Sequence, residues 1–180
     1  MATRTARCAC GRVEVTVEGE PLLVLICHCD FCQKRSGNVF IASAHFAEEE
    51  VIAISGETKV YNGLEADGVG AVGVPGGIDY HFCSRCGSTL YWLSPHSGPP
   101  NIAIAVGNFV DADFPTPTTE LFTKYRHHWV PPIPGAAQVE DPLDGSQPVE
   151  NMVPSLRQGD GARGDSRGAA GEEIRRQTGD

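Results

Sequence analysis

The sequence predicts a single, mostly β domain with antiparallel strands, and three features of the chain support this fold class. Short runs rich in β-branched and aromatic residues recur along the first two thirds of the sequence. Glycine, proline and asparagine separate these runs, as turn residues do between strands. No segment keeps a 3.6-residue apolar period over three turns, so a helical domain is not expected. With 180 residues the chain is long enough to bury a real core.

The predicted strands follow one another at short intervals, and no internal repeat relates them. In RVEVTV, residues 12–17, Val13, Val15 and Val17 alternate with polar residues, which is typical of a half-buried strand. HFAEEE, residues 45–50, has room for one helical turn. Further strand-type runs occupy residues 22–27, 39–46, 51–55, 58–62, 78–83, 89–94, 101–109 and 119–125.

The end of the domain is predicted from a change in composition. After Trp129 the chain passes through VPPIPGAA and then carries repeated Gly, Ser, Gln and charged residues with few apolar ones. Such a segment cannot offset its ordering entropy by burial. We therefore expect one domain over residues 3–133 and a flexible, disordered tail over residues 134–180.

Charge and hydropathy exclude several classes of partner. The formal net charge is −9, and no basic block interleaves with aromatic residues, so nucleic acid is not an expected partner. No run of about 18 apolar residues predicts a membrane span. The opening MATRTARCACGR lacks the apolar region of a secretory signal, which leads us to expect a cytoplasmic protein with reduced thiols. The oligomeric state is left open.

Two pairs of cysteines, far apart in the sequence, predict a closed metal site. Cys8 and Cys10 stand at i and i+2, so in a strand both sulfurs would face one side. In FCSRCGS, Cys83 and Cys86 form a C-x-x-C knuckle, and Gly87 tolerates the positive φ that a tight turn requires. Joined, the four would make a tetrahedral Cys₄ site, which is typical of structural zinc that contributes to folding.

The other three cysteines predict a site with an open position. Cys27 and Cys29 would share a strand face, and Cys29 and Cys32 would form a second knuckle, which supplies three sulfurs and no obvious fourth ligand. Structural zinc sites are normally closed, whereas catalytic ones keep a position for water or substrate. Thiolates favour zinc, with iron next.

Other interpretations of this trio stay open. His28 lies beside it, although strand alternation would point its ring away from the sulfurs. Cys83 or Cys86 could join the trio instead, or Cys29 and Cys32 could be a metal-free redox pair. A distant histidine could also close the site, the candidates being His45, His81, His127 and His128.

The motifs CACGRVEV, CHCDFCQKRSG, FCSRCGSTLY, AVGNFVD and HHWV, in this order, resemble the glutathione-dependent formaldehyde-activating enzyme (GFA) family, which includes centromere protein V. The resemblance covers roughly residues 3–133. It implies a β-tent fold with two zinc ions, similar to zinc-binding Rab-accessory proteins. By motif position it assigns Cys8, Cys10, Cys83 and Cys86 to the structural site, and Cys27, Cys29 and Cys32 to the catalytic site.

The function that the resemblance implies is that of a carbon-sulfur lyase acting on glutathione and formaldehyde through S-hydroxymethylglutathione. Partners would then be a small thiol and a small aldehyde. Members with all seven cysteines need not share a substrate. Two alternatives remain, a zinc-stabilised binding module without activity and a carrier that binds glutathione or another thiol.

Several further residues are candidates for roles near the open trio. His45 and the pair His127 and His128 could move the proton of the substrate thiol, because histidine titrates near neutrality. Arg35 stands where relatives tend to carry a small residue; it could bind a substrate carboxylate, although we favour a solvated side chain. We expect Ser36 and Gly37 to form a plain turn. We expect Trp92 and Trp129 to pack the domain, with a wall of the substrate pocket as the alternative for Trp129.

Overall fold

The computed structural model describes residues 2–63, 78–93 and 101–142. Its helical elements are α1 (Asp30–Ser36) and the 3₁₀ turns η1 (Glu48–Glu50), η2 (Val106–Asn108) and η3 (Thr123–Tyr125). Its strands are β1 (Thr3–Arg7), β2 (Glu14–Glu18), β3 (Leu23–Cys27), β4 (Ile41–Ala47), β5 (Val51–Ser55), β6 (Thr58–Asn62), β7 (Asp79–Cys83), β8 (Thr89–Leu93), β9 (Asn101–Ala105), β10 (Thr119–Leu121) and β11 (Ala137–Val139).

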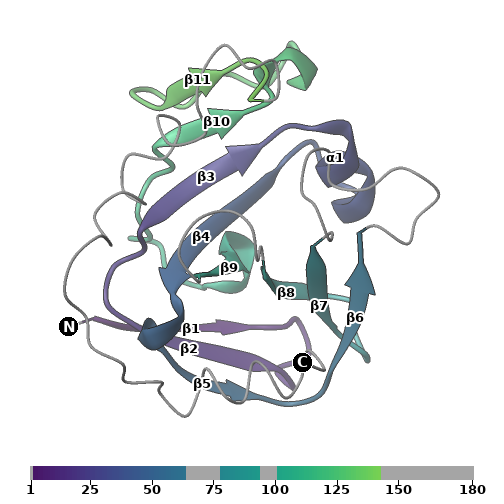
Figure 1. Ribbon diagram of the computed structural model, residues 1–180, viewed down its shortest axis with the longest axis vertical. Coiled ribbons are helices and arrows are strands. Elements are labelled where there is room, and N and C mark those ends of the chain that lie inside the picture. The colour runs from purple at the N-terminus through teal and green to yellow at the C-terminus, as the bar shows by residue number, and fades with distance from the viewer. Residues whose placement is uncertain (1, 64–77, 94–100, 143–180) are drawn as a thin grey trace.

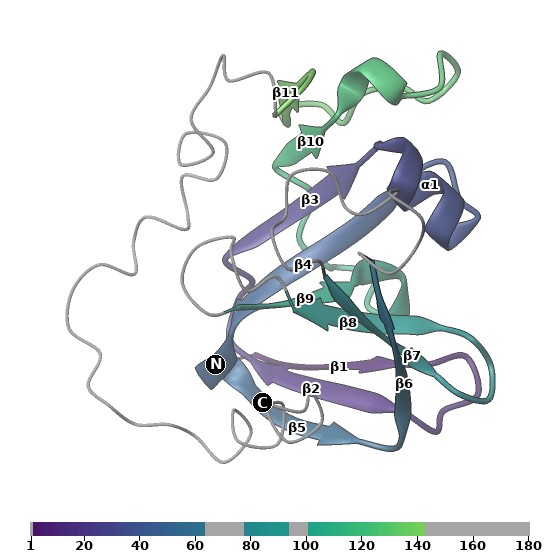
Figure 2. The ribbon, with the colours of Figure 1, turned by 45° about the vertical axis from the view of Figure 1, so that its right-hand side comes forward.

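The strands form two sheets, which Figure 1 and Figure 2 show one below the other. The smaller sheet has the order β1-β2-β5, and the larger has the order β11-β10-β3-β4-β9-β8-β7-β6. Pairing is antiparallel except that β10 runs parallel to both β3 and β11. The mostly β, mostly antiparallel fold predicted from the sequence is confirmed.

The main core lies between the two sheets. Val13, Val15 and Val17 are at most 1% exposed, as their alternation in the sequence predicts. They pack with the inner faces of β4, β8 and β9, where Phe46, Leu90 and other apolar residues are fully buried. This burial of apolar surface is the main source of stability for the domain.

The predicted strand runs coincide with β2 to β10, since each run overlaps one strand. The predicted helical turn at residues 45–50 forms as η1 at its end. The predicted domain end at residue 133 falls before β11, which extends the larger sheet beside β10 and buries Val139 against Leu23 and Leu25. Residues 143–180 of the predicted tail lie outside the described residues.

Helix α1 was not expected, because the sequence from Cys29 to Cys32 suggested a knuckle. In the structure Cys29 is the N-cap of α1, and Gly37 ends the helix in the left-handed conformation with φ 66°. With only seven residues, α1 depends on packing against the sheet rather than on its own propensity. Among the described residues no helix is long and apolar enough to cross a membrane.

Candidate metal centres

Cys8 and Cys10 lie in the turn that joins β1 to β2. The prediction that they lie in a strand is wrong. Strand β1 ends at Arg7, and the amide of Gly11 then donates a hydrogen bond of 2.8 Å to the carbonyl oxygen of Cys8. Gly11 has φ 72°, a conformation that glycine adopts without strain. The two sulfurs converge because the chain turns back on itself, whereas strand alternation would only have placed them on one side.

Cys83 and Cys86 form the knuckle that the sequence predicts. Cys83 is the last residue of β7, and the amide of Gly87 donates a hydrogen bond of 2.9 Å to its carbonyl oxygen. Gly87 has φ 74°, in line with its expected role in the turn. The amide of Ala9 donates to the hydroxyl of Ser88 at 3.1 Å, so the two cysteine turns contact each other directly.

The four sulfurs of this quartet, Cys8, Cys10, Cys83 and Cys86, all lie within 4.8 Å of one another. Two of the sulfur-sulfur distances are 3.5 Å, between Cys8 and Cys10, and 3.7 Å, between Cys10 and Cys83. Tetrahedral coordination with metal-sulfur distances of about 2.3 Å separates the sulfurs by about 3.8 Å. The quartet therefore has the geometry of a closed site that can hold a metal ion.

The second cluster, or trio, is Cys27, Cys29 and Cys32, whose sulfurs also lie within 4.8 Å of one another. Cys27 ends β3, Cys29 caps α1 and Cys32 lies in the first turn of α1. The prediction that Cys27 and Cys29 share a strand face is therefore wrong. The amide of Cys32 donates to the sulfur of Cys29 at 3.3 Å. Hydrogen bonds from the Cys27 and Cys32 thiols lower the pKa of Cys29 well below its usual value. The trio can also hold a metal ion.

No fourth protein ligand joins the trio within the part of the chain that the structure describes. Cys83 and Cys86 belong to the quartet, and the ring of His81 is hydrogen-bonded to Thr58 and stacked on Tyr91. His45 lies on β4 four residues from Ile41, the strand partner of Cys27, which is about 13 Å along the strand. Among described residues the trio therefore supplies three ligand atoms and no fourth.

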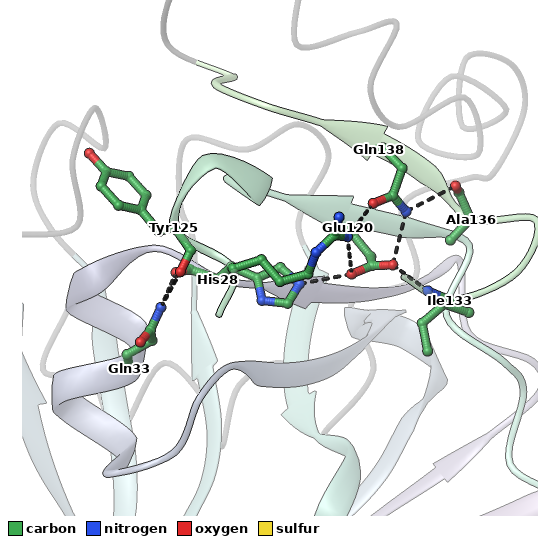
Figure 3. A network of polar contacts seen from close by, with 8 residues as sticks. His28, Gln33, Glu120, Tyr125, Ile133, Ala136 and Gln138 are labelled. Carbon is green, nitrogen blue, oxygen red and sulfur yellow. Dashed lines mark hydrogen bonds and ion pairs between the residues drawn. The ribbon is translucent and has the colours of Figure 1, made fainter. Parts of the chain in front are cut away.

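His28, between two cysteines of the trio in the sequence, is not part of the cluster and belongs instead to a buried polar network, which Figure 3 shows. Its ring is fully buried, and Nε2 lies 2.8 Å from a carboxylate oxygen of Glu120 on β10. Glu120 is 1% exposed and also accepts hydrogen bonds from the Ile133 amide at 2.6 Å and the Gln138 side chain at 2.9 Å. Burial alone would raise the pKa of Glu120, but these hydrogen bonds lower it below its usual value.

Gln33, directly after Cys32, joins α1 to the segment that follows β10. Its side-chain amide donates to the carbonyl oxygens of His28 at 2.6 Å and Tyr125 at 3.1 Å; Figure 3 draws the contact with Tyr125. Its amide oxygen lies 3.1 Å from Nε2 of His127. Of the histidines proposed to move a proton, His127 is thus brought to the helix that carries Cys32, whereas His45 is not.

Aromatic side chains wall the trio on the side of β7 and β8. Cys29 and Cys32 pack against a buried cluster that includes Phe31, Tyr80 and Trp92. The guanidinium of Arg35 lies over this wall, with its carbon 3.8 Å from the ring centre of Tyr80 and 5.6 Å from that of Trp92. The solvated side chain that we favoured for Arg35 is therefore wrong, because the guanidinium is stacked on the domain.

Of the remaining predictions, those for Trp92 and Ser36 agree with the structure, and the one that Trp129 packs the domain does not. Trp92 is 7% exposed and packs the domain as expected, whereas Trp129 is 61% exposed and stacks on His127. The hydroxyl of Ser36 donates to the carbonyl oxygen of Cys32 at 2.8 Å, which fits a plain helix end. Sequence reasoning missed Glu120 and Gln33; a carboxylate inside the strand-type run 119–125 was the one available signal for Glu120.

These features define a mostly β protein with two cysteine centres that can each hold a metal ion. The model of the glutathione-dependent formaldehyde-activating enzyme family matches residues 3–125, and the chain belongs to this family. A curated relative from Halomonas elongata, named "Putative glutathione-dependent formaldehyde-activating enzyme", is 28% identical over 128 residues, which cover 68% of this chain and 76% of the relative. A crystal structure of a Rhodobacter sphaeroides protein matches with a TM-score of 0.43 and 20% identity over 61% of this chain and 90% of that one.

Proposed function

We propose that this chain is a zinc-dependent enzyme of the carbon-sulfur lyase type, which joins a glutathione-like thiol to a small aldehyde such as formaldehyde and reverses the reaction. The observation that carries the proposal is the trio of Cys27, Cys29 and Cys32, which no described side chain closes. Metal sites that keep a free position are typical of catalysis, whereas closed Cys₄ sites are typical of structure. Membership of the family supports the choice of reaction.

We assign zinc to both centres, one ion to each, because sets of thiolate ligands favour zinc among the common divalent ions. The quartet would hold its ion as a structural tie, and Cys27, Cys29 and Cys32 would hold the other. When bound at the trio, zinc supplies the positive charge that favours the thiolate form of an incoming thiol.

The reaction forms one carbon-sulfur bond and changes no oxidation state overall. The sulfur of the thiol attacks the carbonyl carbon, the carbon-oxygen π bond breaks, and the thiol proton ends on the new hydroxyl oxygen. The wall of Phe31, Tyr80 and Trp92 would hold the two small reactants together and exclude water. His127, hydrogen-bonded to Gln33 beside Cys32, is our candidate for moving the proton.

The proposed partners are small molecules, a thiol and an aldehyde. All seven cysteines are free thiols in the structure. Both centres need their sulfurs reduced, and we therefore propose a cytoplasmic location, where thiols stay reduced.

The test is the rate at which glutathione and formaldehyde exchange with S-hydroxymethylglutathione, followed by NMR exchange spectroscopy. Because the reaction also proceeds without a catalyst, the quantity to compare is the increase over the rate without protein. We expect an increase with the zinc-loaded wild type and none with a folded Cys32→Ser variant. Equal rates for the two proteins, or no increase with the wild type, would reject the proposal; tight thiol binding without an increase would indicate a carrier.

A further inference from the structure

Arg35 projects from the same face of α1 as a cysteine of the trio. It follows Cys32 by three residues and Phe31 by four, and side chains three or four residues apart are neighbours on a helix, with Cβ atoms about 5–6 Å apart. Phe31 belongs to the aromatic wall, and Cys32 packs against it. The guanidinium of Arg35 therefore lies on the same wall as the open centre.

The position of this guanidinium is fixed by its surroundings. It lies over the ring of Tyr80 at 3.8 Å and near the ring of Trp92 at 5.6 Å, and Nη1 donates to the hydroxyl of Thr89 at 3.2 Å. Stacking on an aromatic face leaves the N-H groups at the edge of the guanidinium plane. A cation held in this way is preorganised to receive a planar anion.

The guanidinium of Arg35 has no carboxylate partner in the described part of the chain. Its Nε is buried and has no hydrogen-bond partner. No ion pair joins it to a carboxylate of the described residues, whereas Arg7 and Arg126 each pair with one carboxylate and Arg4 pairs with two. A partly buried guanidinium with N-H donors to spare is costly unless something else supplies the acceptors.

We propose that Arg35 binds the carboxylate of the substrate thiol, so that the chain selects thiols that carry a carboxylate over neutral ones. This inference rests on the proposed function, because it assumes that the thiol sulfur is taken up at the trio. The two oxygens of a carboxylate match the paired N-H donors of a guanidinium. Arg35 would then set specificity for the thiol, and Tyr80 and Trp92 would hold it in place.

The experiment compares two thiols of the same length, 3-mercaptopropionate and its uncharged amide, 3-mercaptopropanamide. Binding of each to the zinc-loaded protein is measured by calorimetry. We expect the carboxylate to bind about tenfold more tightly, as for a hydrogen bond between charged groups. In Arg35→Met, which keeps the apolar stem of the side chain against the wall, the two thiols should bind equally.

Lys34→Met is the matched control, because it removes one positive charge from the neighbouring residue of α1. Lys34 is 70% exposed and pairs with Asp30, away from the aromatic wall. This variant should keep the tenfold preference. The preference of the wild type should also shrink as salt is added, a result that needs no variant to fold.

The outcomes separate this inference from the proposed function. If the wild type binds both thiols equally, or if Arg35→Met keeps the preference in a folded and zinc-loaded protein, the role of Arg35 is rejected while the open centre stands. If the wild type binds neither thiol, uptake of a thiol at the trio is rejected, and the proposed function with it.

Discussion

The two cysteine centres differ in where their sulfurs come from. The quartet draws two from the turn between β1 and β2, one from the end of β7 and one from the turn that follows β7, so it joins the smaller sheet to the larger one. The trio draws all three from one stretch, the end of β3 and the first turn of α1. A tie between two sheets is a structural device, whereas a local loop of cysteines constrains little of the fold beyond itself.

The surroundings of the two centres also differ, being apolar at the quartet and partly polar at the trio. Cys8 and Cys83 belong to the main apolar core between the sheets. The trio is bordered instead by aromatic rings, a stacked arginine and the polar network of His28 and Glu120. Buried polar and charged groups are expensive to keep, and their concentration around the trio agrees with the proposal that this centre is the functional one.

The largest effect is expected from breaking the quartet. If the quartet holds a metal ion as proposed, Cys83→Ser removes one of its ligands, and the contribution of the metal to folding is lost with it. We expect a loss of at least about 5 kcal/mol in the free energy of unfolding, much of the stability of a typical domain. Denaturant unfolding measures it, and a variant as stable as the wild type would show that the quartet is not a structural tie.

Trp92→Ala should have the next largest effect, since this side chain packs the wall beside the trio at 7% exposure. Removal of a buried tryptophan costs about 3–5 kcal/mol. Trp129→Ala is the matched control, because Trp129 is 61% exposed and its loss should cost less than about 0.5 kcal/mol. Similar losses in the two variants would contradict the difference in burial.

A smaller loss in the free energy of unfolding is expected for Glu120→Gln. The amide keeps an acceptor for the Ile133 amide and for Gln138 but removes the charge that faces His28 and Arg126. We expect about 2 kcal/mol of destabilisation, within the range for hydrogen bonds to a charged group. Glu57→Gln, at an exposed position, should stay within about 0.5 kcal/mol of the wild type. An equal effect of the two substitutions would show that the network contributes nothing.

The difference in stability between the wild type and Glu120→Gln should depend on pH. The pKa of Glu120 is lowered in the folded chain from its ordinary value of 4.5, so its carboxylate stabilises the fold above that pH. The contribution is lost as the pH falls through the folded pKa, because protonation then favours the unfolded chain. The difference in stability between wild type and Glu120→Gln should therefore be largest near neutral pH and shrink on acidification below 4.5. A difference that grows in acid would have the wrong sign.

The smallest effect on stability is expected for His127→Ala, since this histidine is exposed and its ring contacts the side chains of Gln33 and Trp129 at the surface. The free energy of unfolding should change by less than about 0.5 kcal/mol. Catalysed exchange should slow by about 100-fold if His127 moves the proton. His45→Ala, at the far end of β4, should leave the exchange rate close to that of the wild type. Unchanged exchange in His127→Ala would remove this residue from the proposed mechanism.

The sequence predicts those parts of the fold that depend on neighbouring residues. The alternation of Val13, Val15 and Val17 predicts the buried face of a strand, and the knuckle at Cys83 and Cys86 is visible in the spacing and in Gly87. The shared centre of the four distant cysteines is also predicted from the sequence, because each pair supplies two ligands and a closed site needs four; the structure confirms this pairing over one in which Cys83 or Cys86 joins the trio. Each of these features depends on a pattern within a short segment, or on two such patterns taken together.

The features that could not be predicted depend on contacts between distant segments. Parallel pairing of β10 with β3 brings Glu120 against His28, 92 residues away. The sequence of neither segment predicts this contact. The stacking of Arg35 depends on where β7 and β8 lie relative to α1. The sequence predicts a knuckle in place of α1 because seven residues are too few for a helical period to show.

The most direct test of the difference between the centres is the metal content per chain of Cys32→Ser, measured together with its near-UV circular dichroism. A trio that serves chemistry should lose its ion while the quartet keeps its own. We expect the metal content to fall from about two ions per chain to about one, with the spectrum of the folded domain unchanged. Loss of both ions, or an unfolded chain, would show that the trio is a second structural tie.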